Sequence, residues 1–111
     1  KNNANEIKKI ESENILKKIK NNDLLFLLDE KGKNYDSRDF AKFLKIKFQE
    51  SKTIVFVIGG AFGFSKDLYS KSAGLISLSK MTFSHQIIRL FFCEQLYRAF
   101  TILNNHPYHN D

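Results

Sequence analysis

Cysteine is almost absent from this chain: among its 111 residues there is one, Cys93. A single cysteine excludes a disulfide within the chain. Because Cys93 lies in an apolar helical stretch, we expect a buried, unreactive thiol in a reducing compartment. No apolar run approaches the roughly 18 residues of a membrane span, and the first residues lack the apolar core of a signal peptide. Composition therefore predicts a cytoplasmic protein with no membrane association.

The common signatures of metal and nucleotide sites are also missing. Three histidines and one cysteine make no convincing metal site, and no HExxH motif occurs. Gly59-Gly60-x-x-Gly63 departs from the GxGxxG spacing of dinucleotide sites, and no GK[ST] completes a P-loop. His106 and His109 stand near the end of the chain, where a mobile tail is the default interpretation. We therefore expect no metal.

What the chain does contain is aromatic bulk and positive charge. Eleven phenylalanines, no tryptophan and 42% hydrophobic residues indicate one globular domain over residues 1–111. The net charge of +6 and the isoelectric point of about 9.5 favour a polyanionic partner such as nucleic acid. A basic surface that only keeps the protein soluble is an equally good interpretation of the charge alone.

Hydrophobic patterning predicts helices that alternate with strands. Ser37 is expected to be the N-cap of the second helix, with Asp39 in its first turn and Phe40, Leu44 and Phe48 facing the core. Gly32 is expected to mark a turn. The order predicts an α/β fold with a mostly parallel sheet flanked by helices. In chain order the predicted elements are helix 5–21, strand 24–28, helix 37–49, strand 53–58, helix 65–72, strand 75–78 and helix 84–103.

The last predicted helix, residues 84–103, is apolar on every side. Such a helix must be covered on every side, and one small sheet can cover only part of it. We therefore expect a homodimer in which the second subunit supplies the remaining cover. Glu94 and Arg98 have the spacing of a helical ion pair.

Two loops are predicted to meet where parallel strands end. The segment Gly59–Gly63 follows one strand and Ser79–Phe83 follows another, and the carboxyl edge of a parallel sheet is where ligands bind. Taken alone, the glycines indicate a tight turn more often than a site, and Lys80 is more often a solvated lysine than a phosphate ligand. Neither loop carries a carboxylate. A ligand site at this edge is nevertheless the prediction.

Four segments carry a resemblance to a known family: VIGGAFG at 57–63, SLSKMTFSHQIIR at 77–89, EQLYRAF at 94–100 and NHPYH at 105–109. Together they resemble the ribosomal RNA large-subunit methyltransferase H family, small bacterial members of the SPOUT (α/β-knot) methyltransferases. The resemblance covers the chain from about Glu6. It implies a SPOUT α/β-knot fold with a C-terminal trefoil knot, and a homodimer. The implied reaction moves a methyl group from S-adenosylmethionine to N3 of a pseudouridine in 23S rRNA on the ribosome.

The resemblance also implies which residues contact the cofactor. Chemistry agrees, because adenine needs an apolar slot and the methionine part needs the close backbone approach that Gly59 and Gly60 allow. The residues implied or supported in this way are Leu28, Gly59, Gly60, Leu78, Ser79, Lys80, Met81, Thr82 and Phe83.

Catalysis needs a group that helps N3 of the target base to lose its proton. We hypothesise that the C-terminal tail of one subunit reaches the cofactor of the other, with His109 as proton acceptor beside Tyr108. Arg89 or Arg98 would hold RNA phosphate or stabilise the developing negative charge. A frayed tail without a role is the competing interpretation.

The sequence differs from the family pattern in two places, and two other functions are compatible with it. Family members begin with a further β-strand and connecting segment that have no counterpart here, and Ser84 stands where the family usually has proline. Lack of that strand would expose a sheet edge. The alternatives are a SPOUT methyltransferase of different RNA specificity and a non-catalytic domain that binds RNA or the ribosome.

Overall fold

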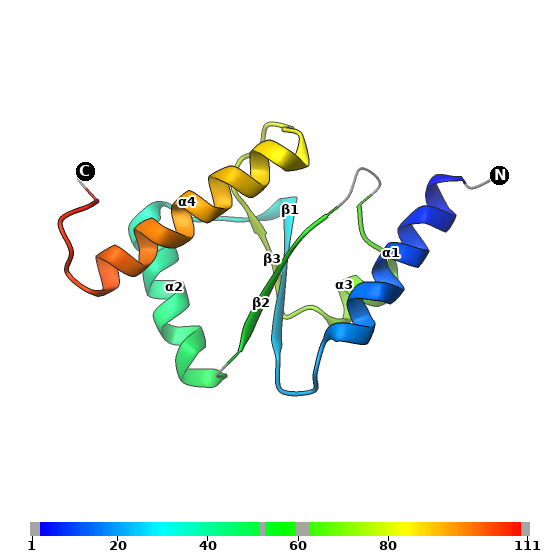
Figure 1. The fold of residues 1–111 in the computed structure, drawn as a ribbon, viewed down its shortest axis with the longest axis horizontal. Helices are drawn as coiled ribbons and strands as arrows, with labels where there is room; N and C mark the ends of the chain where they lie inside the picture. Colours follow the sequence, from blue (N-terminus) through cyan, green and yellow to red (C-terminus); the bar gives the residue numbers. More distant parts are fainter. Residues whose placement is uncertain (1–2, 52, 60–62, 110–111) are drawn as a thin grey trace.

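The structure is a computed structural model that describes residues 3–51, 53–59 and 63–109. Its elements follow the predicted order of alternating helices and strands (Figure 1). None of the helices in these ranges is long and apolar enough to cross a bilayer. The elements are α1 (Ala4–Lys18), β1 (Leu24–Asn34), α2 (Ser37–Glu50), β2 (Ile54–Ile58), α3 (Lys66–Lys71), β3 (Gly74–Ser77) and α4 (His85–Leu103).

The three strands form a parallel sheet in the order β2-β1-β3, so β1 is central. Leu24 to Leu28 of β1 pair residue by residue with Ile54 to Ile58 of β2. The helices lie on both faces, with α2 and α4 on one side and α1 and α3 on the other (Figure 1). The expected parallel α/β architecture is confirmed.

Alternation along β1 divides the core in two. Phe26 and Leu28 point to the α2/α4 face, whereas Leu25 and Leu27 point to the α1/α3 face. All four are at least 92% buried, since their exposed fractions are 8% or less. A strand buried on both faces reads as a continuous apolar run, which is why LLFLL at 24–28 signals it so clearly.

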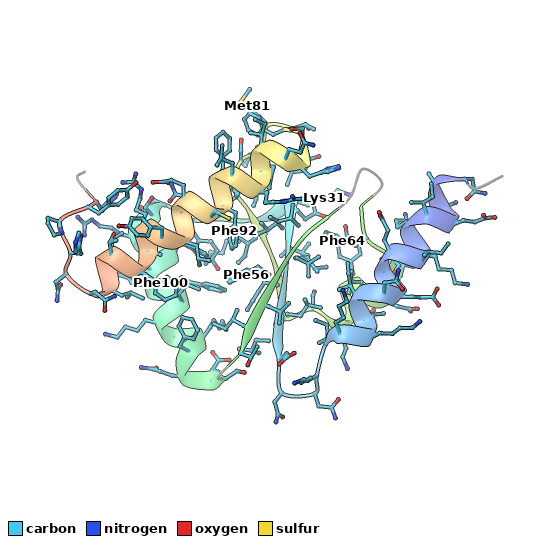
Figure 2. The ribbon with its side chains drawn as sticks, viewed as in Figure 1. Lys31, Phe56, Phe64, Met81, Phe92 and Phe100 are labelled. Atoms are coloured by element: carbon cyan, nitrogen blue, oxygen red, sulfur yellow. The ribbon has the colours of Figure 1, made fainter. Side chains whose placement is uncertain are left out.

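The α2/α4 side of the core is aromatic. Phe92 of α4 packs on Phe56 of β2 with ring centroids 4.8 Å apart, and it meets Phe40 of α2 edge-on at 6.0 Å. Figure 2 shows Phe56 and Phe92 in the space between α4 and the sheet. On the opposite side a polar contact joins the two helices, because Ser12 of α1 accepts a hydrogen bond of 2.9 Å from the amide of Ser65.

The path of β1 beyond Leu28 differs from the expectation of a strand that stops before a turn at Gly32. The strand continues to Asn34, and both Leu28 and Lys33 pair with Ile76 of β3. A Cβ on Gly32 would lie 2.5 Å from the carbonyl carbon of Leu75, closer than any side chain tolerates. Gly32 is therefore required for close contact between two backbones, and the prediction of a simple turn was wrong.

The N-cap of α2 lies one residue earlier than expected. Asp36, not Ser37, is its N-cap, because the Asp36 carboxylate accepts a 2.8 Å hydrogen bond from the amide of Asp39. Asp39 lies in the first turn, as predicted. Phe40 and Leu44 face the core, but Phe48 is 43% exposed, because it lies near the end of the helix, where its ring is 6.0 Å from that of Phe100.

Helix α4 begins after the N-cap Ser84, as predicted, but only one side of it is covered within the chain. Phe92 and Ala99 are buried, whereas Leu90, Phe91 and Tyr97 are 65%, 43% and 54% exposed. Cys93 is exposed as well, which contradicts the expectation of a buried thiol. The apolar sequence around Cys93 did not mean burial, because this side of the helix faces away from the sheet.

The division between covered and uncovered positions can be tested on α2, where a buried residue and an exposed residue lie close together. Leu44 is fully buried and Ile46 is 55% exposed. We expect Leu44→Ala to lower the free energy of unfolding by about 2–5 kcal/mol, through lost burial and the cavity left behind. Ile46→Ala should change it by less than about 1 kcal/mol. Urea unfolding followed by circular dichroism measures both, and equal losses would contradict the assigned packing.

Candidate functional site

A cavity of about 470 Å³ opens at the carboxyl edge of the sheet. The ends of all three strands contribute to it, together with the segment after β3 and the first turn of α4. Its lining residues are Leu28, Asp29, Glu30, Lys31, Ile58, Gly59, Gly63, Phe64, Ile76, Leu78, Ser79, Met81, Thr82, Phe83, Ser84, His85 and Ile88.

The cavity brings together most of the residues that sequence reasoning assigned to the cofactor. Lys80 is not among the lining residues, and Gly60 lies outside the described part of the chain. The predicted residues that line the cavity are Leu28, Gly59, Leu78, Ser79, Met81, Thr82 and Phe83. Segments about 20 to 50 residues apart in sequence therefore converge at one edge, as the parallel arrangement predicted.

Two local features shape the walls of this cavity. A Cβ on Gly59 would lie 2.8 Å from Cζ of the buried Phe64 ring, so a side chain there would push the ring from its place. The segment after β3 is held by Ser79, whose carbonyl accepts a 2.8 Å hydrogen bond from the Ser77 hydroxyl. The Ser79 hydroxyl in turn accepts a 3.0 Å bond from the amide of Met81.

Sequence reasoning missed the third segment of the wall, residues 29–31. It found no carboxylate in the two predicted loops, yet Asp29 and Glu30 both line the cavity. Glu30 accepts a 3.0 Å hydrogen bond from the hydroxyl of Thr82 and so links the end of β1 to the segment after β3. The sequence did contain a signal for these polar residues. The segment DEKG at 29–32 directly follows a buried strand, and such a position puts its side chains at the carboxyl edge of the sheet.

Asp29 is held in one orientation by two hydrogen bonds. The hydroxyl of Tyr69 donates to Oδ2 at 2.6 Å, and the amide of Lys31 donates to Oδ1 at 2.9 Å. Burial, helped by the hydrogen bond to Asp29 and the charge of that carboxylate, raises the pKa of Tyr69 to about 12. At neutral pH Tyr69 is therefore a hydrogen-bond donor to Asp29.

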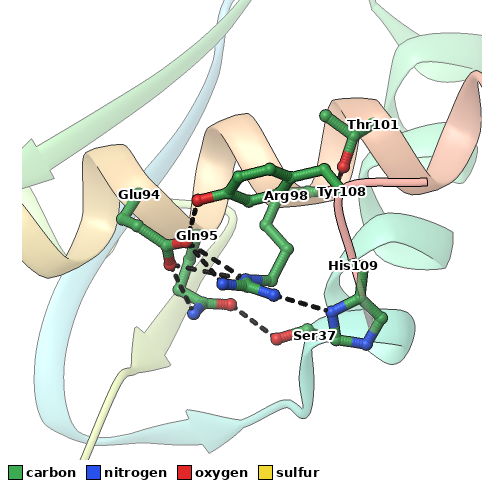
Figure 3. A network of polar contacts seen from close by, with 7 residues as sticks. All are labelled: Ser37, Glu94, Gln95, Arg98, Thr101, Tyr108 and His109. Atoms are coloured by element: carbon green, nitrogen blue, oxygen red, sulfur yellow. Dashed lines mark hydrogen bonds and ion pairs between the residues drawn. The ribbon is translucent and has the colours of Figure 1, made fainter. Parts of the chain in front are cut away.

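Three of the four predicted catalytic residues, Arg98, Tyr108 and His109, belong to a separate polar network around the end of α4 (Figure 3). Arg98 pairs with Glu94 at 2.7 Å, which confirms the expected ion pair, and its guanidinium lies 4.9 Å from the centre of the Tyr108 ring. Tyr108 donates to Glu94 at 3.0 Å, and Nη1 of Arg98 is 3.0 Å from Nδ1 of His109. The tail therefore packs on its own helix in a defined arrangement.

Hydrogen bonds and charges in this network shift the pKa values of Glu94, Arg98 and Tyr108. The hydrogen bond from Arg98 is the main cause that holds the pKa of Glu94 below its usual value. The hydrogen bond to Glu94 is the main cause that raises the pKa of Tyr108. A further bond of 2.7 Å from the Ser37 hydroxyl to Gln95 connects the network to the start of α2.

Within one chain this network does not reach the cavity. Arg98 lies 10 residues along α4 from Ile88, the nearest lining residue on that helix, which corresponds to about 15 Å. None of Arg98, Tyr108 and His109 lines the cavity, and exposed Arg89 does not line it either. The described residues contain no group of three or more histidine, cysteine or carboxylate side chains that could hold a metal ion.

Comparison with known proteins agrees with this geometry. A family model described as "Predicted SPOUT methyltransferase" matches residues 1–109. Proteins named ribosomal RNA large subunit methyltransferase H are similar to the chain in several bacteria. The one from Flavobacterium psychrophilum is 59% identical over 104 residues, which are 93% of this chain and 66% of the relative. The one from Christiangramia forsetii is 51% identical over 107 residues, 96% of this chain and 68% of the relative.

The chain thus spans about two thirds of the length of the curated relatives it matches. The match runs through all the segments that form the cavity and the network at the end of α4. The chain belongs to the SPOUT methyltransferase family, and within it to the ribosomal RNA large subunit methyltransferase H proteins.

Proposed function

We propose that this protein is an S-adenosylmethionine-dependent methyltransferase that methylates N3 of a pseudouridine in 23S rRNA on the ribosome. The observation that carries the proposal is the cavity at the sheet edge. Seven of the nine residues that the resemblance and cofactor chemistry assigned to S-adenosylmethionine line it. Its volume of about 470 Å³ lies in the usual range for sites of small molecules, about 300–1,000 Å³.

The walls of the cavity suit the parts of the cofactor. When bound, S-adenosylmethionine supplies a methyl group on a positively charged sulfur. Leu28, Leu78 and Phe83 provide apolar surface for adenine. Gly59 also lines the cavity, and its lack of a side chain leaves the space that the buried Phe64 ring occupies beside it.

The trefoil knot of the family is part of the proposal. Support comes from Ile76, which is paired with Leu28 before residues 29–32 and with Lys33 after them. A strand residue pairs with one neighbour on each side, so these partners are expected on opposite sides of β3. Residues 29–32 would then pass around β3, and the chain that continues into α4 would leave through this loop.

A two-fold homodimer through α4 is also proposed. The uncovered side of the helix and the segment before it expose large apolar side chains at Phe83, Ile87, Leu90, Phe91 and Tyr97. Intervals of three or four residues place Phe83, Ile87, Leu90 and Phe91 on one stripe, and Tyr97 lies two turns beyond Leu90 on the same side. An exposed apolar surface of this kind marks an interface. A two-fold axis would bring the same stripe of both subunits together.

In such a dimer the C-terminal network could serve the partner's cavity, although Arg98 is about 15 Å along α4 from the cavity of its own chain. Arginine has only donors, so Nδ1 of His109 accepts from Arg98, and the neutral ring carries its hydrogen on Nε2. His109 can accept a proton at Nδ1 once Arg98 withdraws. We propose that RNA phosphate draws Arg98 away and that the proton of N3 then moves to Nδ1 of His109. Arg89 is exposed and would add a second phosphate contact.

Cofactor binding at Gly59 can be tested by substitution. Gly59→Val should abolish S-adenosylmethionine binding by calorimetry while the chain stays folded, because the side chain and the displaced Phe64 ring would fill the cavity. Ser70→Val, at an exposed position of α3, is the control and should bind S-adenosylmethionine normally. Unchanged affinity in Gly59→Val would contradict the site. Lack of any heat with the unmodified chain would favour a non-catalytic binding domain.

The second prediction concerns the dimer. Leu90→Asp should weaken dimerisation by about tenfold or more, because it places a charge in the apolar stripe, with the circular dichroism spectrum unchanged. Ile46→Asp, at a position on α2 that is 55% exposed, should leave the dimer intact. Light scattering over a range of concentrations measures both. A monomeric unmodified chain at micromolar concentration would refute the proposed interface.

The third prediction concerns the tail. His109→Ala, Tyr108→Phe and a chain that stops after Asn105 should each bind cofactor normally but methylate ribosomes more slowly, His109→Ala by about a hundredfold. Ribosomes that lack pseudouridine should not be methylated by any of them. Mixed dimers of tail-less and Gly59→Val chains should retain one working site if the tail acts across the interface. Wild-type rates in all three variants would exclude a catalytic role of the tail.

A further inference from the structure

Asp29 of the cavity carries a negative charge that is not balanced by an ion pair within the described part of the chain. Its carboxylate lines the cavity and accepts hydrogen bonds from Tyr69 and Lys31, both from uncharged donor groups. Among the residues that the structure describes, no ion pair involves it. Each carboxylate oxygen has a second lone pair, so Asp29 can still accept hydrogen bonds from a ligand.

The orientation of Asp29 is set by a supported hydroxyl. Tyr69 lies on α3 and packs edge-on against Phe64, with ring centroids 5.7 Å apart. Figure 2 shows Phe64 between β2 and α1, on the side of the sheet away from Phe92. The raised pKa of Tyr69 keeps the hydroxyl protonated, so it remains a donor to Asp29. Phe64 also forms the wall of the cavity next to Gly59. The same ring therefore packs against Tyr69 and shapes the cavity at Gly59.

The cavity has an apolar end next to the α2/α4 face of the sheet and a polar end next to the α1/α3 face. Leu28, Ile58, Leu78 and Ile88 belong to the apolar cluster of the α2/α4 face. The Asp29 carboxylate is bound to Tyr69, which belongs with Phe64 to the cluster of the α1/α3 face. A ligand with an apolar ring and a cationic group would place the ring at the first end and the cation at the second.

We propose that Asp29 binds the α-ammonium group of the amino-acid part of the cofactor, and that Tyr69 is a positioning residue for this carboxylate. The proposal rests on the proposed function, because it assumes that S-adenosylmethionine occupies the cavity. A positively charged ammonium group can donate hydrogen bonds to a carboxylate that is already held in one orientation. Such charge-assisted hydrogen bonds are about twice as strong as neutral ones. Glu30 is less suited to this role, because it is exposed and already bound to Thr82.

Two ligands separate this role from other uses of the same carboxylate. S-adenosylhomocysteine has the amino-acid part, and 5′-methylthioadenosine keeps the adenosine and the thioether but lacks it. We expect Asp29→Asn to weaken S-adenosylhomocysteine binding by about tenfold or more, and to leave 5′-methylthioadenosine binding within about twofold. Calorimetry with the full chain measures both. Asp67→Asn removes an exposed charge from α3 outside the cavity and should change neither affinity.

The positioning role of Tyr69 has its own readout. Tyr69→Phe keeps the ring and its packing on Phe64 but removes the hydroxyl, so it should weaken S-adenosylhomocysteine binding less than Asp29→Asn does. It should have no further effect in the Asp29→Asn background, because its target is then already lost. Additive losses would show that Tyr69 acts independently of Asp29.

Three results would overturn the proposal. Equal loss of both ligands in Asp29→Asn would mean that the carboxylate binds the ribose or only supports the fold. Unchanged affinity for S-adenosylhomocysteine would mean that it binds no part of the cofactor. Additive effects of the two substitutions would remove the assignment of Tyr69. If the unmodified chain bound neither ligand, the proposed function itself would fail, which is a distinct outcome.

Discussion

The position of β1 between two parallel strands is the constraint on which the rest of the molecule depends. Because β1 pairs with β2 on one side and β3 on the other, Leu28 of β1 lies level with Ile58 and Ile76, near the carboxyl ends of β2 and β3. The burial of residues 25–28 on both faces makes this arrangement hard to change, since a shift of one residue would exchange the side chains of the two cores. The cavity is a direct consequence, because it is bounded by the segments that leave this edge.

The same alternation explains why the cavity has an apolar end and a polar end. Even-numbered residues of β1 join the aromatic cluster under α4, so the surface near Leu28 is apolar. The next residue, Asp29, is bonded to α3 on the other face, where it meets the Tyr69 hydroxyl. Neighbouring residues at the end of one strand thus provide surfaces of opposite character within a single site.

Much of this architecture could be predicted from sequence, and the errors have physical causes. Continuous apolar runs identified β1 and β2, and the predicted starts of the helices at 65 and 84 lie within one residue of the starts of α3 and α4. The extension of β1 to Asn34 could not be foreseen, because polar residues give no sequence signal that pairing with β3 resumes after a shift in register. Gly32 was read as a turn because the backbone of Leu75, which excludes a side chain there, is distant in sequence.

The candidate site was predictable to a similar degree. The cofactor segments after β2 and β3 came from glycine content and family motifs, and six of the residues predicted there line the cavity, together with Leu28 of β1. Asp29 and Glu30 were missed because both belong to a segment that was assigned to a turn. Exposure of Cys93 was also missed, since an apolar helix does not reveal which of its sides a second subunit would cover.

Hydrogen exchange with and without S-adenosylhomocysteine tests most directly whether the three segments form one cofactor site. The account predicts slower exchange of backbone amides at 28–31, at 58–59 and at 78–88 when the ligand is bound. Amides of α1 should be unaffected, because its residues do not line the cavity. Protection of one segment without the other two, or protection in α1 instead, would contradict the claim that this edge of the sheet binds the cofactor.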